Sequence, residues 1–220
     1  MRINQNTALV SKALVLVPYR REHVQTYHGW MQDPEIRDLT ASEELSLEEE
    51  YEMQRKWAED EDKLTFIVLA RTADDTDVPL SNADIRALPM VGDVNLFFKG
   101  SPSDEDFEVE VEVMIAEKAF RRRNLAHTAV SLLLSYATTP PPDLQHAPSS
   151  KTGAGPVPIS FLPIPPSVLV ARISQTNTPS IKLFEKLGFQ VVKVVEVFGE
   201  VEMRYRGDGV WEKGEAIWFD

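Results

Sequence analysis

Cysteine is absent from this 220-residue sequence. The absence excludes disulfides, thiolate-bound zinc, iron–sulfur clusters and a cysteine nucleophile, and it favours a cytosolic protein. Long apolar runs are absent too. No stretch approaches the ~20 residues of a membrane-spanning helix, and the apolar residues 13–17 are too few for a signal-peptide core. We therefore expect no membrane partner.

Basic residues are outnumbered, because 23 Lys and Arg stand against 35 Asp and Glu and give a formal net charge of −12. Nucleic acid and anionic lipid repel such a chain, so neither is an expected partner. The field of an acidic protein instead attracts cations such as amines.

The composition favours a single domain over residues 1–220. Hydrophobic residues make up 43% of the chain, which is enough to bury a core. Nine of the 15 prolines fall in 140–166, together with Ser, Gly and Thr. We interpret about 138–166 as a disordered insertion within the domain rather than as a boundary between domains.

Apolar periodicity predicts one α/β unit with the order β-α-α-β-β-β-α-β-α-β-β. A capping box of Ser46 and Glu49 starts the second helix. The polar stretch 71–89 predicts a loop. The predicted strands are 13–17, 64–70, 90–98, 108–115, 168–173, 189–198 and 200–206, and the predicted helices are 22–31, 46–58, 126–137 and 180–187.

The first stretch with chemical potential is Arg121-Arg122-Arg123-Asn124-Leu125-Ala126, between a predicted strand and a predicted helix. Unpaired N–H groups at a helix start favour a bound anion, and three arginines add positive charge. A phosphate-bearing ligand is one interpretation. The other is an arginine cluster that solvates the helix start or pairs with 104–106.

The second stretch runs from Asn177 to Phe189. Asn177 follows a predicted strand, Pro179 suits a first helical turn, and Phe184 belongs to an apolar helix face. Core packing explains the helix itself. The fixed spacing of an asparagine, a small hydroxyl residue, an aromatic residue and Gly-Phe is more specific.

Together the two stretches resemble the acetyl-coenzyme A-binding motifs of the GNAT N-acetyltransferase superfamily. The first is similar to Arg/Gln-x-x-Gly-x-Gly/Ala, with Asn124 in place of the first glycine, and the second to Asn-x-x-Ser/Ala-x-x-x-aromatic-x-x-x-Gly-Phe. Further segments resemble the N-acetyltransferase 9-like branch, and that likeness covers residues 1 to about 206 except the insertion and the loop after Ala70. These segments are 4–7, 39–43, 91–97 and 112–117.

The resemblance implies a GNAT fold: a mixed, mostly antiparallel sheet flanked by helices, with a V-shaped opening for acetyl-CoA. It also implies acetylation of a protein N-terminus, with tubulin or microtubules as the partner, by direct attack of the amine in a ternary complex and without a metal. The absence of cysteine agrees, because no acyl-thiol enzyme can form.

The resemblance further implies roles for particular residues. Amides of 122–126 would hold the pyrophosphate, with charge from Arg121 and Arg123, while 113–115 would pair with the pantetheine arm and offer an N–H to the developing oxyanion. Asn177 would reach across from the neighbouring strand. The implied acetyl-CoA site comprises Val113, Met114, Ile115, Arg121, Arg122, Arg123, Asn124, Leu125, Ala126, Asn177, Ser180 and Phe184.

Two residues depart from the family pattern. Asn124 tolerates left-handed backbone better than most residues, so the phosphate loop can still form. Phe184 stands where several GNAT enzymes carry a proton-donating tyrosine. Either another group donates, or the thiolate leaves unassisted, because a thiol of pKa ~8–9 is a good leaving group.

A general base must deprotonate an α-ammonium, whose reference pKa is ~7.7–8.0. Glu108, Glu110 and Glu112 alternate with valines and project from one face of a strand, about 7 Å apart. Mutual repulsion is expected to raise their pKa values. We expect Glu112 to be the base, with Glu110 second; equally, the three glutamates would be a solvated strand face.

Asp93 and Asn95 would complete an acidic amine pocket or make buried hydrogen bonds. Two other functions stay open: a binding protein with weak or lost chemistry, motivated by Asn124 and Phe184, and an acetyltransferase for polyamines or other small amines, motivated by the net charge.

Overall fold

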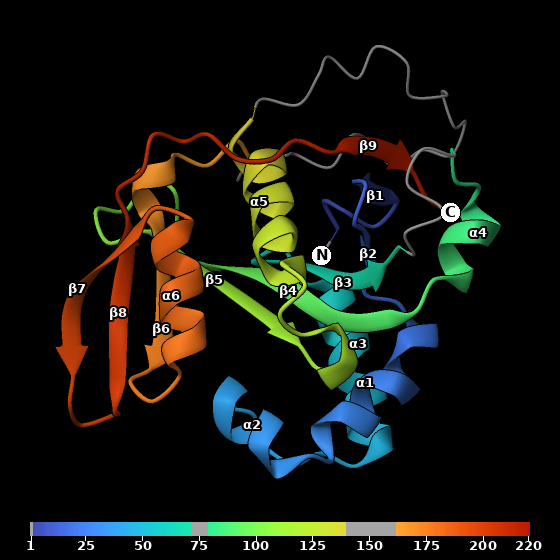
Figure 1. Ribbon diagram of the computed structural model, residues 1–220, viewed down its shortest axis with the longest axis horizontal. Helices are drawn as coiled ribbons and strands as arrows, with labels where there is room; N and C mark the ends of the chain where they lie inside the picture. The colour runs from blue at the N-terminus through green and yellow to red at the C-terminus, as the bar shows by residue number, and fades with distance from the viewer. Residues whose placement is uncertain (1, 72–78, 140–161) are drawn as a thin grey trace.

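The computed structural model describes residues 2–71, 79–139 and 162–220, and these residues form one sheet flanked by helices (Figure 1). The strands follow the order β7-β8-β6-β5-β4-β3-β2-β1-β9. Neighbouring strands are antiparallel except for the β5–β6 pair, which is parallel. The strands are β1 Thr7–Val10, β2 Leu14–Pro18, β3 Lys63–Ala70, β4 Met90–Lys99, β5 Glu108–Ile115, β6 Leu169–Ser174, β7 Phe189–Val195, β8 Glu200–Tyr205 and β9 Glu215–Trp218.

The helices cover both faces of this sheet. They are α1 Val24–Met31, α2 Pro34–Thr40, α3 Leu47–Glu59, α4 Asn82–Ala87, α5 Leu125–Thr138 and α6 Thr178–Lys186, with short 3₁₀ turns at Arg21–His23, Lys118–Phe120 and Pro166–Val168. Helices α5 and α6 bury apolar side chains such as Leu133 and Phe184 in one core. On the opposite face, Tyr27 and Trp30 of α1 and Ile36 of α2 belong to a second core.

Strand β5 follows the predicted alternation. Val109 and Val111 are buried in the core under α5, whereas the glutamates that alternate with them project to the face that carries α1, α2 and α3. The expected division of this strand into an apolar face and an acidic face is confirmed.

The parallel pairing of β5 with β6 is short. It joins Val109 to Leu169 and Glu110 to Val170. Beyond these positions, within the described residues, β5 stays paired with β4 and β6 with β8. The two strands therefore diverge, and this divergence is the expected V-shaped opening.

Four elements were not predicted. The first helix ends at Met31, as predicted, but Asp33-Pro34 then starts the unpredicted helix α2, because the Asp33 carboxylate accepts from the Glu35 amide at 3.0 Å. Helix α4 lies in the predicted loop 71–89, where Ser81 and Asp84 form a capping box. Strands β1 and β9 have four residues each and pair with one another although they lie near opposite ends of the sequence. The local sequence pattern therefore does not predict them.

Two boundaries also change. Residues 196–199 form the turn between β7 and β8, so β7 ends at Val195 rather than at 198. Disorder was expected as far as 166, yet Ile164 is 2% exposed and its amide donates to the Ala137 carbonyl at 2.9 Å, which fixes the chain after α5. The rest of the predicted insertion, 140–161, lies outside the described residues.

Candidate active site

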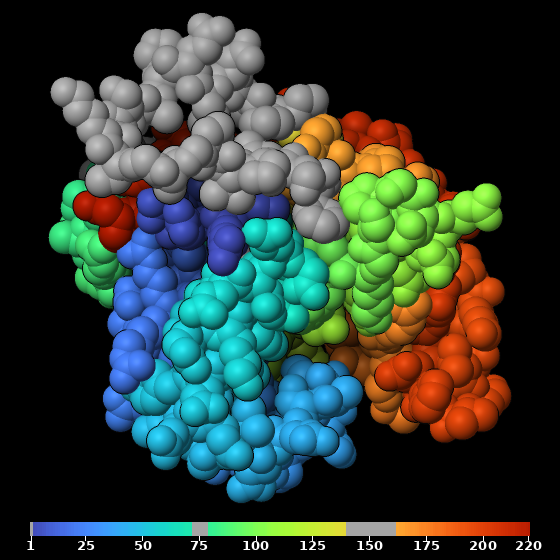
Figure 2. Space-filling view, turned by 180° about the vertical axis from the view of Figure 1, so that it is seen from behind, coloured from blue at the N-terminus to red at the C-terminus, as the bar shows by residue number. Residues whose placement is uncertain are grey.

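A cleft of about 230 Å³ lies where β5 and β6 diverge. Figure 2 shows the surface hollowed between the light-blue region of α2 and the orange region of the C-terminal strands. The cleft is lined by Tyr27, Asp38, Leu39, Thr40, Ala41, Ser42, Trp57, Asp93, Asn95, Glu110, Val111, Glu112, Val113, Met114, Arg172, Ile173, Ser174, Asn177, Ser180, Phe184 and Glu200. It therefore brings together predicted residues from β4, β5 and α6.

The arginine-rich loop has the backbone that its motif requires. Arg122 and Asn124 are left-handed, with φ of 61° and 63°, and Asn124 is the N-cap of α5. Asparagine thus adopts the conformation that the family's glycine would supply. The first amides of α5 have no intrahelical acceptors, so they are available to an anion.

Two arginines of this loop have structural contacts. Arg121 donates from Nε to the Ile115 carbonyl at 2.8 Å and from a terminal nitrogen to the Ala116 carbonyl at 3.2 Å. The Arg123 guanidinium lies 5.0 Å from the centre of the Phe120 ring. The Arg121 hydrogen bonds fix the loop to the end of β5, and the Arg123 contact packs it on the preceding 3₁₀ turn. In the described part of the chain, no ion pair joins the loop to residues 104–106, the alternative expected from the sequence.

The start of α6 forms the opposite wall of the cleft. Asn177 is the N-cap, and its side-chain oxygen accepts from the Ser180 amide at 3.2 Å. Phe184 is 3% exposed and packs edge-on against Phe189, with ring centres 5.1 Å apart. The side chain of Asn177 therefore caps the helix, and Phe184 lines the cleft while its ring packs in the core.

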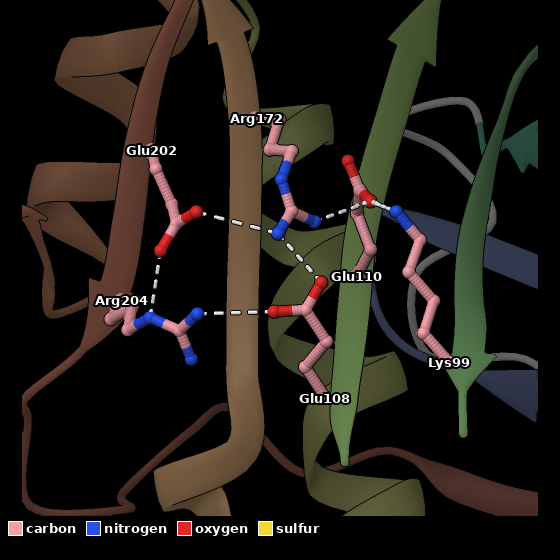
Figure 3. A network of polar contacts seen from close by, with 6 residues as sticks. All are labelled: Lys99, Glu108, Glu110, Arg172, Glu202 and Arg204. Carbon is pink, nitrogen blue, oxygen red and sulfur yellow. Dashed lines mark hydrogen bonds and ion pairs between the residues drawn. The ribbon is translucent and has the colours of Figure 1, made fainter. Parts of the chain in front are cut away.

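The first two glutamates of β5 belong to an ion-pair network that spans β4, β5, β6 and β8 (Figure 3). Arg172 contacts Glu108 at 2.6 Å and Glu110 at 2.9 Å. Arg204 contacts Glu108 at 3.0 Å. Glu202 and Lys99 complete the network, Glu202 beside both arginines and Lys99 beside Glu110.

This network corrects the prediction that repulsion raises the pKa of every glutamate in the ladder. Burial raises the pKa of Glu108, but hydrogen bonds and charge from Arg172 and Arg204 outweigh it, so the pKa is lowered. The side chains of Glu108 and Glu110 are only 14% and 8% exposed. The interpretation as a solvated face is therefore wrong for these two residues.

The third glutamate, Glu112, has no ion-pair partner among the described residues. It borders both the cleft and a second, adjoining cavity that is also lined by Lys63 and Lys99. Its surface is open to the cleft, yet enough protein surrounds the carboxylate that desolvation, followed by the charges of Glu110 and Asp93, raises its pKa to about 7. This carboxylate is poised to exchange a proton near neutral pH.

Asp93 and Asn95 form the floor of the cleft on β4. Asp93 is 3% exposed, and its Oδ2 accepts from Asn95 Nδ2 at 3.0 Å and from the Tyr27 hydroxyl at 3.4 Å. Burial raises its pKa to about 6 in spite of these hydrogen bonds. The Asn95 Oδ1 is buried and has no donor in the described part of the protein, so the floor keeps a free acceptor.

Three residues near the site were not found from the sequence. Tyr27 was assigned only to a helix, and Arg172 only to a strand. Glu50 of α3 is 1% exposed, lies 3.9 Å from His28 Nδ1, and has a pKa raised to about 7 by burial. It follows Glu48 and Glu49 in the chain, and such a run at a helix start looks like ordinary N-terminal charge.

Within residues 2–71, 79–139 and 162–220, the histidines and acidic residues form no group that is suited to hold a metal ion. A search of the same ranges finds no helix with the length and apolar character to cross a membrane.

Comparison with known proteins defines the class. The family model described as an acetyltransferase (GNAT) domain matches residues 13–190. The chain therefore belongs to the GNAT acetyltransferase family, and its activity is acetyl-CoA-dependent N-acetyl transfer.

Within that class, the chain is similar to N-acetyltransferase 9 proteins. It is 44% identical over 207 residues to alpha/beta-tubulin-N-acetyltransferase 9 of Mus musculus, covering 93% of this chain and 73% of the mouse protein. It is 41% identical over 211 residues to the N-acetyltransferase 9-like protein of Caenorhabditis briggsae, covering 94% and 90%.

Solved structures show the same fold. Spermidine N-acetyltransferase from Vibrio cholerae, in complex with CoA and spermine, superposes with a TM-score of 0.60 at 16% identity, covering 93% of this chain and 95% of the other. A putative GNAT-family acetyltransferase from Bordetella pertussis gives 0.58 at 17% identity, covering 90% and 99%.

Proposed function

We propose that this chain acetylates the α-amine of a protein N-terminus in the cytoplasm, with tubulin as the first candidate substrate. The observation that carries the proposal is an unpaired carboxylate, Glu112, with a pKa near 7 at the opening between β5 and β6. Relatives named as tubulin N-acetyltransferases support the choice of substrate.

The residues around the opening fit acetyl-CoA. Left-handed Arg122 and Asn124 turn the chain so that the first amides of α5 are available to a pyrophosphate. The backbone of 113–115 lies beyond the β5–β6 pairing and, apart from the Ile115 carbonyl that accepts from Arg121, is available to an extended pantetheine arm. Asn177, Ser180 and Phe184 would line the other side of that arm. When bound, acetyl-CoA supplies an activated acetyl thioester.

Glu112 then acts as the general base. An α-ammonium has a reference pKa of ~7.7–8.0, so a carboxylate of pKa about 7 takes its proton with little mismatch, directly or through one water. Asp93 and the free oxygen of Asn95 would orient the ammonium beside it. Glu110 is the weaker candidate, because Lys99 and Arg172 hold its carboxylate.

A side-chain acid is not required. Phe184 has no proton to donate, and a thiol of pKa ~8–9 leaves readily as the thiolate near neutral pH. Amides of 113–115 would stabilise the negative charge that develops on the acetyl oxygen.

Acetylation of small polyamines is the second candidate, and the acidic lining of the cleft favours it. Asp38, Asp93, Glu110, Glu112 and Glu200 face it, against Arg172 as the basic lining residue.

The test is release of coenzyme A from acetyl-CoA by the purified chain, with N-terminal peptides and spermidine as separate acceptors. We expect release with peptides and mass spectrometry to place the acetyl group on the α-amine. Release with spermidine alone would transfer the proposal to polyamines. Calorimetry that detects no binding of acetyl-CoA below roughly millimolar would instead favour a protein that has lost its chemistry.

A further inference from the structure

The cleft contains more negative charge than one substrate amine can balance. Five carboxylates line it, and Arg172 is already paired with Glu108, Glu110 and Glu202. An α-ammonium beside Asp93 and Glu112 adds one positive charge. Asp38 and Glu200 then remain as carboxylates that neither Arg172 nor the substrate amine balances.

These two residues lie on opposite walls of the cleft. Asp38 is exposed on α2, and Glu200 is the partly buried first residue of β8. The walls correspond to the light-blue and orange sides of the hollow in Figure 2. The turn before Glu200 is anchored to the β6–α6 loop, because the Gln175 amide donates to the Gly199 carbonyl at 2.8 Å.

Neither carboxylate has a hydrogen-bond or ion-pair partner within the described ranges. The floor of the cleft also has an acceptor without a donor, the buried Asn95 Oδ1. A cleft whose acceptors are left free on the floor and on both walls is complementary to a ligand with several N–H donors and more than one positive charge.

We propose that the cleft selects polypeptide N-termini with Lys or Arg at the second or third residue, and that Asp38 and Glu200 read this charge. The inference rests on the N-terminal acetylation proposed above. A chain entering in extended form points successive side chains in opposite directions. Side chains 2 and 3 therefore approach opposite walls, and each wall carries one free carboxylate.

The effect on selectivity should be moderate, because both carboxylates contact solvent. We expect each basic side chain to raise kcat/KM about two- to fivefold through a lower KM, since a charge remote from the reacting atoms binds substrate and transition state alike. The gain should shrink as salt is raised.

The experiment uses decapeptides of one sequence with Lys, Ser or Glu at residue 2 or 3. A matched peptide carries Lys at residue 8, so that net charge is constant while position changes. We expect the order Lys, Ser, Glu in kcat/KM, and no gain from Lys at residue 8. Asp38→Asn and Glu200→Gln should each reduce the differences in kcat/KM among the Lys, Ser and Glu peptides. Glu215→Gln, on an exposed strand at the far edge of the sheet, should leave these differences unchanged.

Charge reversal makes the test sharper. Glu200→Lys should shift the preference toward Glu at one of the two positions, with thermal unfolding confirming that the variant is folded. Acetylation of all peptides at equal kcat/KM would overturn this inference and leave the proposed function intact. Acetylation of spermidine but of no peptide would overturn both.

Discussion

Two regions of strand β5 show opposite electrostatics although they are four residues apart on one face. Glu108 lies in a network of arginines that holds its pKa below the ordinary value. Glu112 has no such partner, and its pKa rises to about 7. The same residue type on the same strand thus becomes either a structural anion or a candidate base.

The divergence of β6 explains the difference. Arg172 lies on β6 two residues after Val170, the last residue paired with β5, and its side chain contacts Glu108 and Glu110. Past Glu110 the strands separate, and Arg172, which follows Val170 by two residues as Glu112 follows Glu110, pairs with Glu108, Glu110 and Glu202; among the described residues it has no ion pair with Glu112. One change in backbone direction therefore opens the candidate acetyl-CoA site and, in the described part of the chain, leaves the neighbouring carboxylate without an ion-pair partner.

Removing the unpaired carboxylate should have the largest effect. Glu112→Gln keeps the shape of the side chain but cannot accept the substrate proton, so kcat/KM should fall about 10²-fold or more. In the unmodified protein, activity should rise with pH through about 7 as Glu112 loses its proton, and the variant should lose that limb. The measurement is a pH profile of kcat/KM with saturating acetyl-CoA.

Glu108→Gln is the matched control for this profile. It removes a carboxylate from the same face of the same strand, but one that belongs to the ion-pair network. The free energy of unfolding should therefore change, while the rise of kcat/KM near pH 7 should remain. A Glu112→Gln profile that retains the limb would move the role of base to another group, such as Asp93 or Glu110.

Breaking the ion-pair network of Figure 3 should lower the stability of the fold rather than the rate of acetyl transfer. Arg172→Met leaves Glu108 and Glu110 largely buried beside fewer cations, and we expect a loss of about 2–3 kcal/mol in the free energy of unfolding at pH 7. The lowered pKa of Glu108 stabilises the fold above its unfolded pKa, and this contribution disappears as pH falls through the folded pKa. The deficit of the variant should therefore shrink in acid.

Urea unfolding of Arg172→Met between pH 3 and 8 measures this effect. Arg206→Met is the control, because Arg206 is exposed and its side chain makes only a long contact with its neighbour's carbonyl, at 3.5 Å, within the described structure. Equal stability of the two variants at pH 7 would show that the network contributes little.

The sequence predicted what local pattern determines. Alternating valines and glutamates predicted the two faces of β5, and Asn124 was expected to tolerate left-handed backbone just before a helix. The structure confirms both. The partners of Glu108 were beyond reach, since Arg172 and Arg204 lie 64 and 96 residues away and only sheet topology brings them together. Strand β9 was missed for the same reason, because its partner β1 is at the other end of the chain.

Glu50 extends the comparison to a carboxylate that is almost fully buried and lacks a strong counter-ion. Burial raises its pKa from 4.5 to about 7, so the unfolded chain releases this proton more easily than the folded one. Its contribution to stability is full below pH 4.5 and is lost as pH rises through about 7.

The variant Glu50→Gln removes the ionisation and should raise the free energy of unfolding at pH 8 by about 1–2 kcal/mol, with little change at pH 4. Thermal unfolding at both pH values measures it, with Glu48→Gln, an exposed acid on the same helix, as the control. A stabilisation equal at pH 4 and pH 8 would contradict the assignment, because a better-packed amide acts at any pH, whereas an unpaired carboxylate destabilises the fold only after it ionises.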